Sequence, residues 1–180
     1  MNLPNKLTML RVLLVPVFVL LLLWEEGAVQ AFRLAALAVF CIASFTDFLD
    51  GQIARRCHLV TNFGKFMDPL ADKLLVCSGL VCLIQLGQLP AWYVILVIAR
   101  EFIISGFRLV AAGSGVVIAA SWWGKLKTVS QMLLLMLLIL KLPQLSALTR
   151  FFYWLSLLLT LLSLFDYIAK NRRVITEGGM

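Results

Sequence analysis

The chain has 180 residues, of which 62% are hydrophobic and only 14% are charged. Soluble domains are about half apolar and about one quarter charged, so this composition excludes an ordinary soluble fold. The mean hydropathy of +0.99 instead predicts a single membrane-embedded domain over residues 1–180. In such a protein, the formal net charge of +7 indicates basic cytoplasmic loops and contact with membrane lipids rather than binding of nucleic acid.

Six apolar segments are each long enough to cross a bilayer as a helix, which needs about 20 residues. In chain order they cover about residues 7–24, 31–54, 64–86, 90–110, 126–142 and 148–168. The first segment is followed by Trp24, Glu25 and Glu26 without a small-residue cleavage site, which favours a retained helix over a signal peptide. The sequence therefore predicts an all-α, polytopic membrane protein with six transmembrane helices.

An even number of spans places both termini on one side of the membrane, and the basic residues predict which side. With cytoplasmic termini, three basic residues fall outside, namely Arg33, Lys141 and Arg150. Thirteen then lie inside: Lys6, Arg11, Arg55, Arg56, Lys65, Lys73, Arg100, Arg108, Lys125, Lys127, Lys170, Arg172 and Arg173. Because Lys and Arg are enriched in cytoplasmic loops, we expect both termini in the cytoplasm.

Four of the five aspartates fall between positions 47 and 72. An ionised aspartate at the bilayer centre costs roughly 2.5–3.5 kcal/mol, so such residues face a watery cavity or bind cations. Asp47 and Asp50 share a helix face at the end of the second segment, and Asp68 and Asp72 share one at the start of the third. Four converging carboxylates suit hard cations, which predicts Mg²⁺ or Mn²⁺, two per site, and phosphoryl chemistry.

Small and basic residues flank these aspartates. Gly51 and Gly64 remove side chains, so that a ligand can approach the backbone closely. Arg55 follows Gly51 by one helical turn, where it suits a diphosphate. The alternative interpretation is a set of helix caps and surface ion pairs. It fits a single aspartate such as Asp166, four residues before Lys170, better than four aspartates at matched spacing.

A second group of charged residues lies in the fourth and fifth segments. Arg100 falls near mid-membrane, Arg108 lies two turns nearer the inner face, and Lys125 and Lys127 open the fifth segment. Together they would form a basic cavity for a small anionic substrate. Two alternatives stay open, namely an ion pair of Arg100 with Glu101 and ordinary positive-inside flanking by the lysines.

The aspartate region resembles the CDP-alcohol phosphatidyltransferase family. The family motif D-x-x-D-G-x-x-A-R, eight residues, then G-x-x-x-D-x-x-x-D is matched at every fixed position by Asp47, Asp50, Gly51, Ala54, Arg55, Gly64, Asp68 and Asp72. Three further stretches resemble the bacterial phosphatidylglycerophosphate synthase branch, namely residues 2–11, 100–108 and 123–128. The resemblance therefore extends over nearly the whole chain.

The resemblance implies a bacterial inner-membrane enzyme, active on the cytoplasmic side, that transfers a phosphatidyl group from CDP-diacylglycerol to sn-glycerol 3-phosphate. Two divalent cations would be held by Asp47, Asp50, Asp68 and Asp72, with Asp72 also the catalytic base. The donor would be bound by Asn5, Thr8, Gly51, Ala54, Arg55 and Gly64. The acceptor would be bound by Arg100, Arg108, Lys125 and Lys127. Relatives in this family form homodimers, so a homodimer is expected.

The sequence leaves several alternative functions open. Within the family, the acceptor alcohol could instead be inositol phosphate or serine. A divalent-cation transporter also carries intramembrane acids, but its acids lie near the midplane among broken helices or repeats. Here the aspartates cluster at one face beside Arg55, and no repeat is visible. A purely structural membrane subunit would leave the aspartates unexplained.

Overall fold

The computed structural model describes the backbone of residues 3–56, 62–113 and 121–170. Within these ranges, the side chains at positions 3–6, 47–56, 62–69, 72, 110, 112 and 113 lie outside the description. The described residues form helices and turns without any strand, which confirms the predicted all-α class for them. The elements are α1 (Leu3–Leu23), η1 (Trp24–Gly27), α2 (Gln30–Arg56), α3 (Asn62–Gln85), α4 (Ala91–Gly113), α5 (Trp122–Leu140), η2 (Pro143–Leu145) and α6 (Ser146–Lys170).

The long helices coincide with the six predicted apolar segments, apart from shifts of a few residues at their ends. Among the described residues, three stretches are long and apolar enough to cross a membrane, namely Leu7–Gly27, Trp122–Leu140 and Pro143–Lys170. Shorter apolar stretches occupy Gln30–Thr46 and Lys73–Gln85. Helix α4 is continuous, but three charged residues interrupt its apolar sequence, namely Arg100, Glu101 and Arg108. The structure thus supports a membrane protein, while the count of six spans stays a prediction.

The chain divides into two compact units. The first unit comprises Met1–Leu89 and Leu138–Lys141, and the second comprises Pro90–Leu137 and Leu142–Met180. The first unit therefore contains α1, α2 and α3 together with the last residues of α5. The second contains α4, most of α5, and α6.

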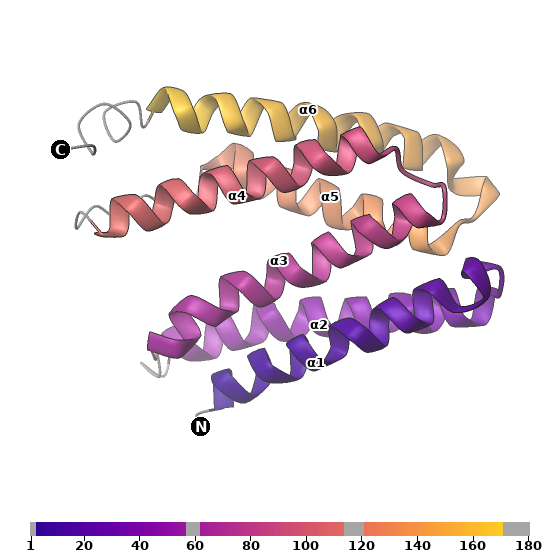
Figure 1. The fold of residues 1–180 in the computed structure, drawn as a ribbon, viewed down its shortest axis with the longest axis horizontal. Coiled ribbons are helices and arrows are strands. Elements are labelled where there is room, and N and C mark those ends of the chain that lie inside the picture. The colour runs from indigo at the N-terminus through magenta and orange to yellow at the C-terminus, as the bar shows by residue number, and fades with distance from the viewer. Residues whose placement is uncertain (1–2, 57–61, 114–120, 171–180) are drawn as a thin grey trace. The chain divides into compact units, whose positions relative to one another are not determined.

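In the first unit, α1, α2 and α3 run in alternating directions (Figure 1), and α1 packs against both of the others. The rings of Phe18 in α1 and Phe40 in α2, both fully buried, lie 5.7 Å apart. Leu13 and Leu20 on the opposite side of α1 are more than 60% exposed. A helix that is apolar all round and only partly covered by protein is suited to contact lipid.

Two turns with left-handed backbone follow α1 and α3 in the first unit. Between α1 and α2, the φ angles are 46° at Glu25, 54° at Glu26 and 66° at Gly27. After α3, Gly87 also has a φ of 66°. There the Gln88 amide donates to the Leu83 carbonyl at 2.9 Å, which satisfies a carbonyl at the helix end as in a Schellman cap.

In the second unit, polar side chains join α4 to α6. The Tyr93 and Ser156 hydroxyls lie 2.7 Å apart, and Arg100 Nε donates to Ser163 Oγ at 3.1 Å. Both pairs are separated by 63 residues in the sequence, so α4 and α6 run in the same direction, as Figure 1 shows. Helix α5 returns the chain between them.

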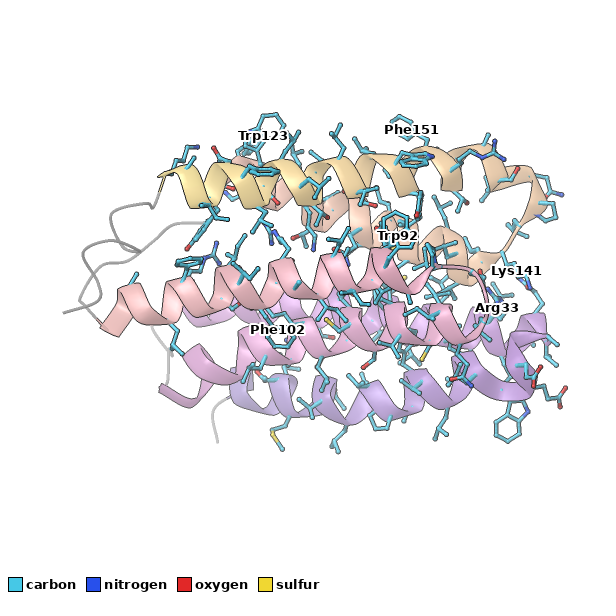
Figure 2. All side chains as sticks on the ribbon, turned by 45° about the horizontal axis from the view of Figure 1, so that its top comes forward. Arg33, Trp92, Phe102, Trp123, Lys141 and Phe151 are labelled. Carbon is cyan, nitrogen blue, oxygen red and sulfur yellow. The ribbon has the colours of Figure 1, made fainter. Side chains whose placement is uncertain are left out.

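The last residues of α5 are held in the first unit by the buried side chain of Arg33, which is 1% exposed. Its Nε donates to the Ile139 carbonyl at 2.8 Å, and its Nη2 donates to the Leu138 carbonyl at 2.6 Å. Figure 2 shows Arg33 and Lys141 at the same end of this unit. The arginine thus caps carbonyl groups that the end of a helix leaves without partners.

Candidate functional site

The backbone brings the two halves of the aspartate motif to the same end of the first unit. Asp47 and Asp50 lie in the last turns of α2, and Asp68 and Asp72 lie in the first turns of α3. These two helix ends lie beside the start of α1 (Figure 1). The helix assignments that the motif required are confirmed, and the predicted juxtaposition is supported by the backbone.

The side chains of the motif lie outside the described residues, so the roles predicted for them stay predictions. This applies to all four aspartates and to the residues expected to bind the donor within α1, α2 and α3, namely Asn5, Gly51, Ala54, Arg55 and Gly64. Among the side chains that are described, no group of three His, Cys, Asp or Glu residues could hold a metal ion. Four carboxylates on adjoining helix ends are a donor set that fits hard divalent cations.

Two polar residues of α1 are buried near this end of the first unit. Thr8, expected to contact the donor, is 0% exposed, and Arg11 is 1% exposed. The Arg11 Nε donates to the Ala43 carbonyl of α2 at 3.4 Å. Ala43 precedes Asp47 by one helical turn. Arg11 therefore fixes α1 to the part of α2 that leads into the motif, a role that its position in the sequence did not indicate.

Two of the four predicted acceptor-binding residues meet at one carboxylate in the second unit. Glu101 Oε1 accepts from Arg100 Nη1 at 2.8 Å and from Lys127 Nζ at 2.6 Å. The side chains of Arg100 and Lys127 are 8% and 3% exposed, against 19% for Glu101. The pairing of Arg100 with Glu101 was one of the alternatives left open by the sequence. The contact of Glu101 with Lys127 was not foreseen.

The other two predicted acceptor-binding residues do not join this cluster. The Arg108 guanidinium lies 6.0 Å from the centre of the Tyr167 ring, and Lys125 Nζ lies 5.9 Å from that of Trp122. Both are within the range of a cation–π contact. Arg108 follows Arg100 by eight residues on α4, which separates them by roughly 12 Å along the helix axis. The described contacts therefore do not support one compact pocket of four cations.

Asp166 behaves as expected for an isolated aspartate. Its Oδ1 lies 2.7 Å from Lys170 Nζ, one helical turn further along α6. The lysine side chain is 66% exposed, so this is a surface ion pair of small energetic weight. Asp166 is thereby distinguished from the four aspartates of the motif.

Residues 1–162 match the profile of the CDP-alcohol phosphatidyltransferase family. A Bacillus subtilis protein named CDP-diacylglycerol–glycerol-3-phosphate 3-phosphatidyltransferase is 44% identical, with 94% of this chain and 95% of the relative aligned. A Mycobacterium tuberculosis protein named probable phosphatidylglycerophosphate synthase is 42% identical over 99% of this chain and 85% of its own length. An Escherichia coli protein with the first of these names is 37% identical over 95% of both chains. The chain belongs to the CDP-alcohol phosphatidyltransferase family.

Proposed function

We propose that this protein transfers the phosphatidyl group of CDP-diacylglycerol to sn-glycerol 3-phosphate, yielding phosphatidylglycerophosphate and CMP. The observation that carries this proposal is the complete aspartate motif, placed by the backbone on adjoining ends of α2 and α3 (Figure 1). The names of relatives with 37–44% identity over most of their length point to the same donor and acceptor.

The metal ligands in this proposal are Asp47, Asp50, Asp68 and Asp72. Divalent cations bound there would neutralise the diphosphate of the donor and the charge that develops on the departing CMP. Arg55, one turn after Gly51 in α2, adds a planar donor for the same diphosphate. The absence of a side chain at Gly51 allows the nucleotide to approach the helix.

Asp72 serves as the general base in the transfer. Its carboxylate accepts the proton of the acceptor's hydroxyl group. The freed oxygen bonds to the lipid-side phosphorus of the donor, while the bond between that phosphorus and the oxygen of CMP breaks. CMP leaves with the electron pair of this bond, and the proton passes from Asp72 to water. The buried Arg11, which donates to the Ala43 carbonyl, keeps α1 in place beside this end of α2.

The site is assigned to the cytoplasmic interface of a six-span protein. CDP and glycerol phosphate are water-borne groups, whereas the diacyl chains of the donor stay in the bilayer. Within each unit, successive helices alternate in direction (Figure 1), as a chain that crosses the membrane repeatedly requires. The excess of basic residues at the predicted inner ends assigns both termini to the cytoplasm.

Impermeant thiol labelling tests this topology. In a variant without native cysteines, Leu59→Cys should be protected from a reagent added outside intact cells, and Gln144→Cys should react. Position 59 falls between α2 and α3, and Gln144 lies in η2 between α5 and α6. Labelling of position 59 from outside would invert the orientation and move the site to the outer face.

Release of CMP by the purified protein tests the activity. With CDP-diacylglycerol and Mg²⁺, glycerol 3-phosphate should support faster release than inositol phosphate or serine. Asp68→Asn should lower turnover at least roughly a hundredfold, because it removes a charged cation ligand. The control is Asp166→Asn, which loses only the surface pair with Lys170. Chelation by EDTA should abolish turnover, and added Mg²⁺ should restore it. Normal turnover of Asp68→Asn would refute the metal assignment.

A further inference from the structure

One face of α6 forms an open groove near the start of the helix. The groove has a volume of about 520 Å³ and is lined by Ala147, Arg150, Phe151, Trp154, Leu155 and Leu158. These residues follow one another at steps of one, three or four positions, so they share one stripe along the helix. Phe151 and Trp154 are 58% and 59% exposed. Because α6 is long and apolar enough to span a membrane, an exposed apolar stripe of this kind marks an interaction surface.

The opposite face of α6 carries small polar residues and packs on α4. Ser156, Thr160 and Ser163 are each at most 1% exposed. Ser156 contacts Tyr93, and Ser163 contacts Arg100, both in α4. Helices in membranes associate through small residues, because these let two backbones come close. The bulky groove face is therefore better suited to flexible acyl chains than to another helix.

One wall of the groove is held in place by aromatic contacts that reach the core of the second unit. Trp154 meets Tyr153 edge to face, with the ring centres 5.3 Å apart, and Tyr153 stacks on Tyr93 at 4.8 Å. Tyr93 is fully buried, and its hydroxyl lies 2.7 Å from that of Ser156. The Trp154 ring is thus fixed before any ligand arrives, which lowers the entropic cost of binding against it.

The groove contains one cation, which has no carboxylate partner. Arg150 is exposed and makes no ion pair with any residue that the structure describes. The two carboxylates described in the second unit, Glu101 and Asp166, pair with other basic residues. A long side chain near the end of a spanning helix places its charge at the interface while its stem stays in the apolar region. Arg150 therefore offers a positive charge to the headgroup region.

The length of the groove matches one leaflet. Arg150 lies in the second turn of α6, and Leu158 follows eight residues later, about 12 Å further along the axis. Half of the hydrocarbon core of a bilayer is about 15 Å deep. The groove thus runs from one interface to about mid-membrane, as the acyl chain of a single phospholipid does.

A second copy of the chain fits this face poorly. In a symmetric dimer with its axis along the membrane normal, the face would meet itself, and two Arg150 side chains would lie at the same depth. Their like charges would repel each other in a medium of low dielectric constant. An anionic headgroup would instead neutralise the single cation. The charge of the groove therefore favours a lipid over a copy of the protein.

We propose that this groove binds one anionic phospholipid, whose phosphate contacts Arg150 and whose acyl chain lies along Phe151, Trp154 and Leu158. In the proposed topology α6 begins at the outer interface, so the lipid belongs to the outer leaflet and is a bound ligand rather than a substrate. A zwitterionic phospholipid carries its own ammonium group, which competes with Arg150 for the phosphate. The groove should therefore prefer a headgroup with a net negative charge.

Quenching of Trp154 by phospholipids with brominated chains tests this site. In the full-length protein with its other four tryptophans replaced by phenylalanine, the fluorescence reports on the groove alone. In uncharged detergent, brominated phosphatidylglycerol should half-quench Trp154 at a roughly fivefold lower concentration than brominated phosphatidylcholine. Arg150→Gln should remove this preference, and Arg150→Lys should keep most of it. The matched control is Lys170→Gln, which removes an exposed cation at the other end of α6 and should behave as the parent variant does.

Several outcomes of this titration would overturn the proposal. Equal half-quenching concentrations for the two lipids would show that the groove contacts bulk lipid without selecting it. A preference that survives Arg150→Gln would place the headgroup elsewhere. Loss of the preference on addition of inorganic phosphate at the concentration of the lipid would show that Arg150 binds a soluble anion. In detergent free of lipid, Arg150→Gln should unfold at the same temperature as the parent, and a lower temperature would give Arg150 a structural role instead.

Cross-linking tests the competing occupant. In membranes containing a variant without native cysteines, Phe151→Cys should remain monomeric under oxidising conditions, whereas a disulfide-linked dimer would show that a second copy covers the groove. Neither experiment uses the release of CMP, so both decide the lipid site whether or not the proposed function holds. Outside labelling of Gln144→Cys, two residues before α6 begins, decides the leaflet.

Discussion

Replacing Arg33 with methionine should destabilise the protein strongly, because this arginine caps the end of α5 inside the first unit. Its side chain donates to the Leu138 and Ile139 carbonyls at 2.6 Å and 2.8 Å, and to the Gly27 carbonyl at 3.3 Å. In either orientation of its amide, Gln88 also accepts a hydrogen bond from Arg33. Methionine matches the length of the apolar stem but donates to none of these oxygens.

The size of the effect follows from the groups left without partners. Leu138 and Ile139 are buried, at 9% and 0% exposure, so water cannot readily replace the guanidinium. Each buried carbonyl that loses its donor costs about 1–3 kcal/mol. Removing the buried charge offsets part of this destabilisation, because the desolvation of the guanidinium is no longer required. We therefore expect Arg33→Met to lower the free energy of unfolding by about 2–5 kcal/mol.

Equilibrium unfolding in mixed micelles, followed by tryptophan fluorescence, measures this loss. Arg150→Met is the matched control, because Arg150 is an exposed arginine and should change the free energy by less than about 0.5 kcal/mol. Arg33→Lys should fall between the two, since an ammonium group cannot serve two carbonyls as a planar fork does. Equal stabilities of Arg33→Met and Arg150→Met would refute the capping role.

Two further predictions concern left-handed backbone positions and use the same unfolding assay. Gly27 and Gly87 share a φ of 66°, but a Cβ would lie 2.9 Å from Arg33 Nη1 at Gly27 and meet nothing within 4 Å at Gly87. Gly87→Ala should therefore lower the free energy of unfolding by about 1–2 kcal/mol. Gly27→Ala should lower it by at least about 1 kcal/mol more. Equal losses for the two variants would contradict the contact with Arg33. Lys141, with a φ of 49°, follows the last turn of α5, so Lys141→Gly should stabilise the protein by about 1 kcal/mol. A loss of stability on that change would show that the lysine side chain outweighs the backbone strain.

The sequence was sufficient to predict the helices, because each is encoded by its own long apolar run. The aspartate motif could also be assigned to helix ends, since the periodicity of Asp47 and Asp50, and of Asp68 and Asp72, is a local property of the chain. The backbone of α2 and α3 agrees with that assignment. A feature that depends only on local periodicity can be predicted from one segment of the sequence.

Contacts between helices were not predictable in the same way. Glu101 meets Lys127 across 26 residues, and that contact depends on the height at which α5 begins beside α4. The positive-inside rule counted Arg33 as one basic residue on the outer side. It counts charges near the ends of spans and says nothing of the carbonyls that a buried side chain reaches. The cap on α5 therefore required the structure.

Two of the buried arginines, Arg33 and Arg100, differ in how many of their donors the described residues use. Burial does not distinguish them, because Arg33 is 1% exposed and Arg100 is 6% exposed. A guanidinium carries five N–H donors, and Arg33 makes four hydrogen bonds, all to neutral oxygens. Arg100 makes two, to Ser163 and Glu101, among the residues that the structure describes. The guanidinium of Arg33 is therefore nearly saturated by the first unit, whereas the guanidinium of Arg100 keeps donors that the described residues do not use.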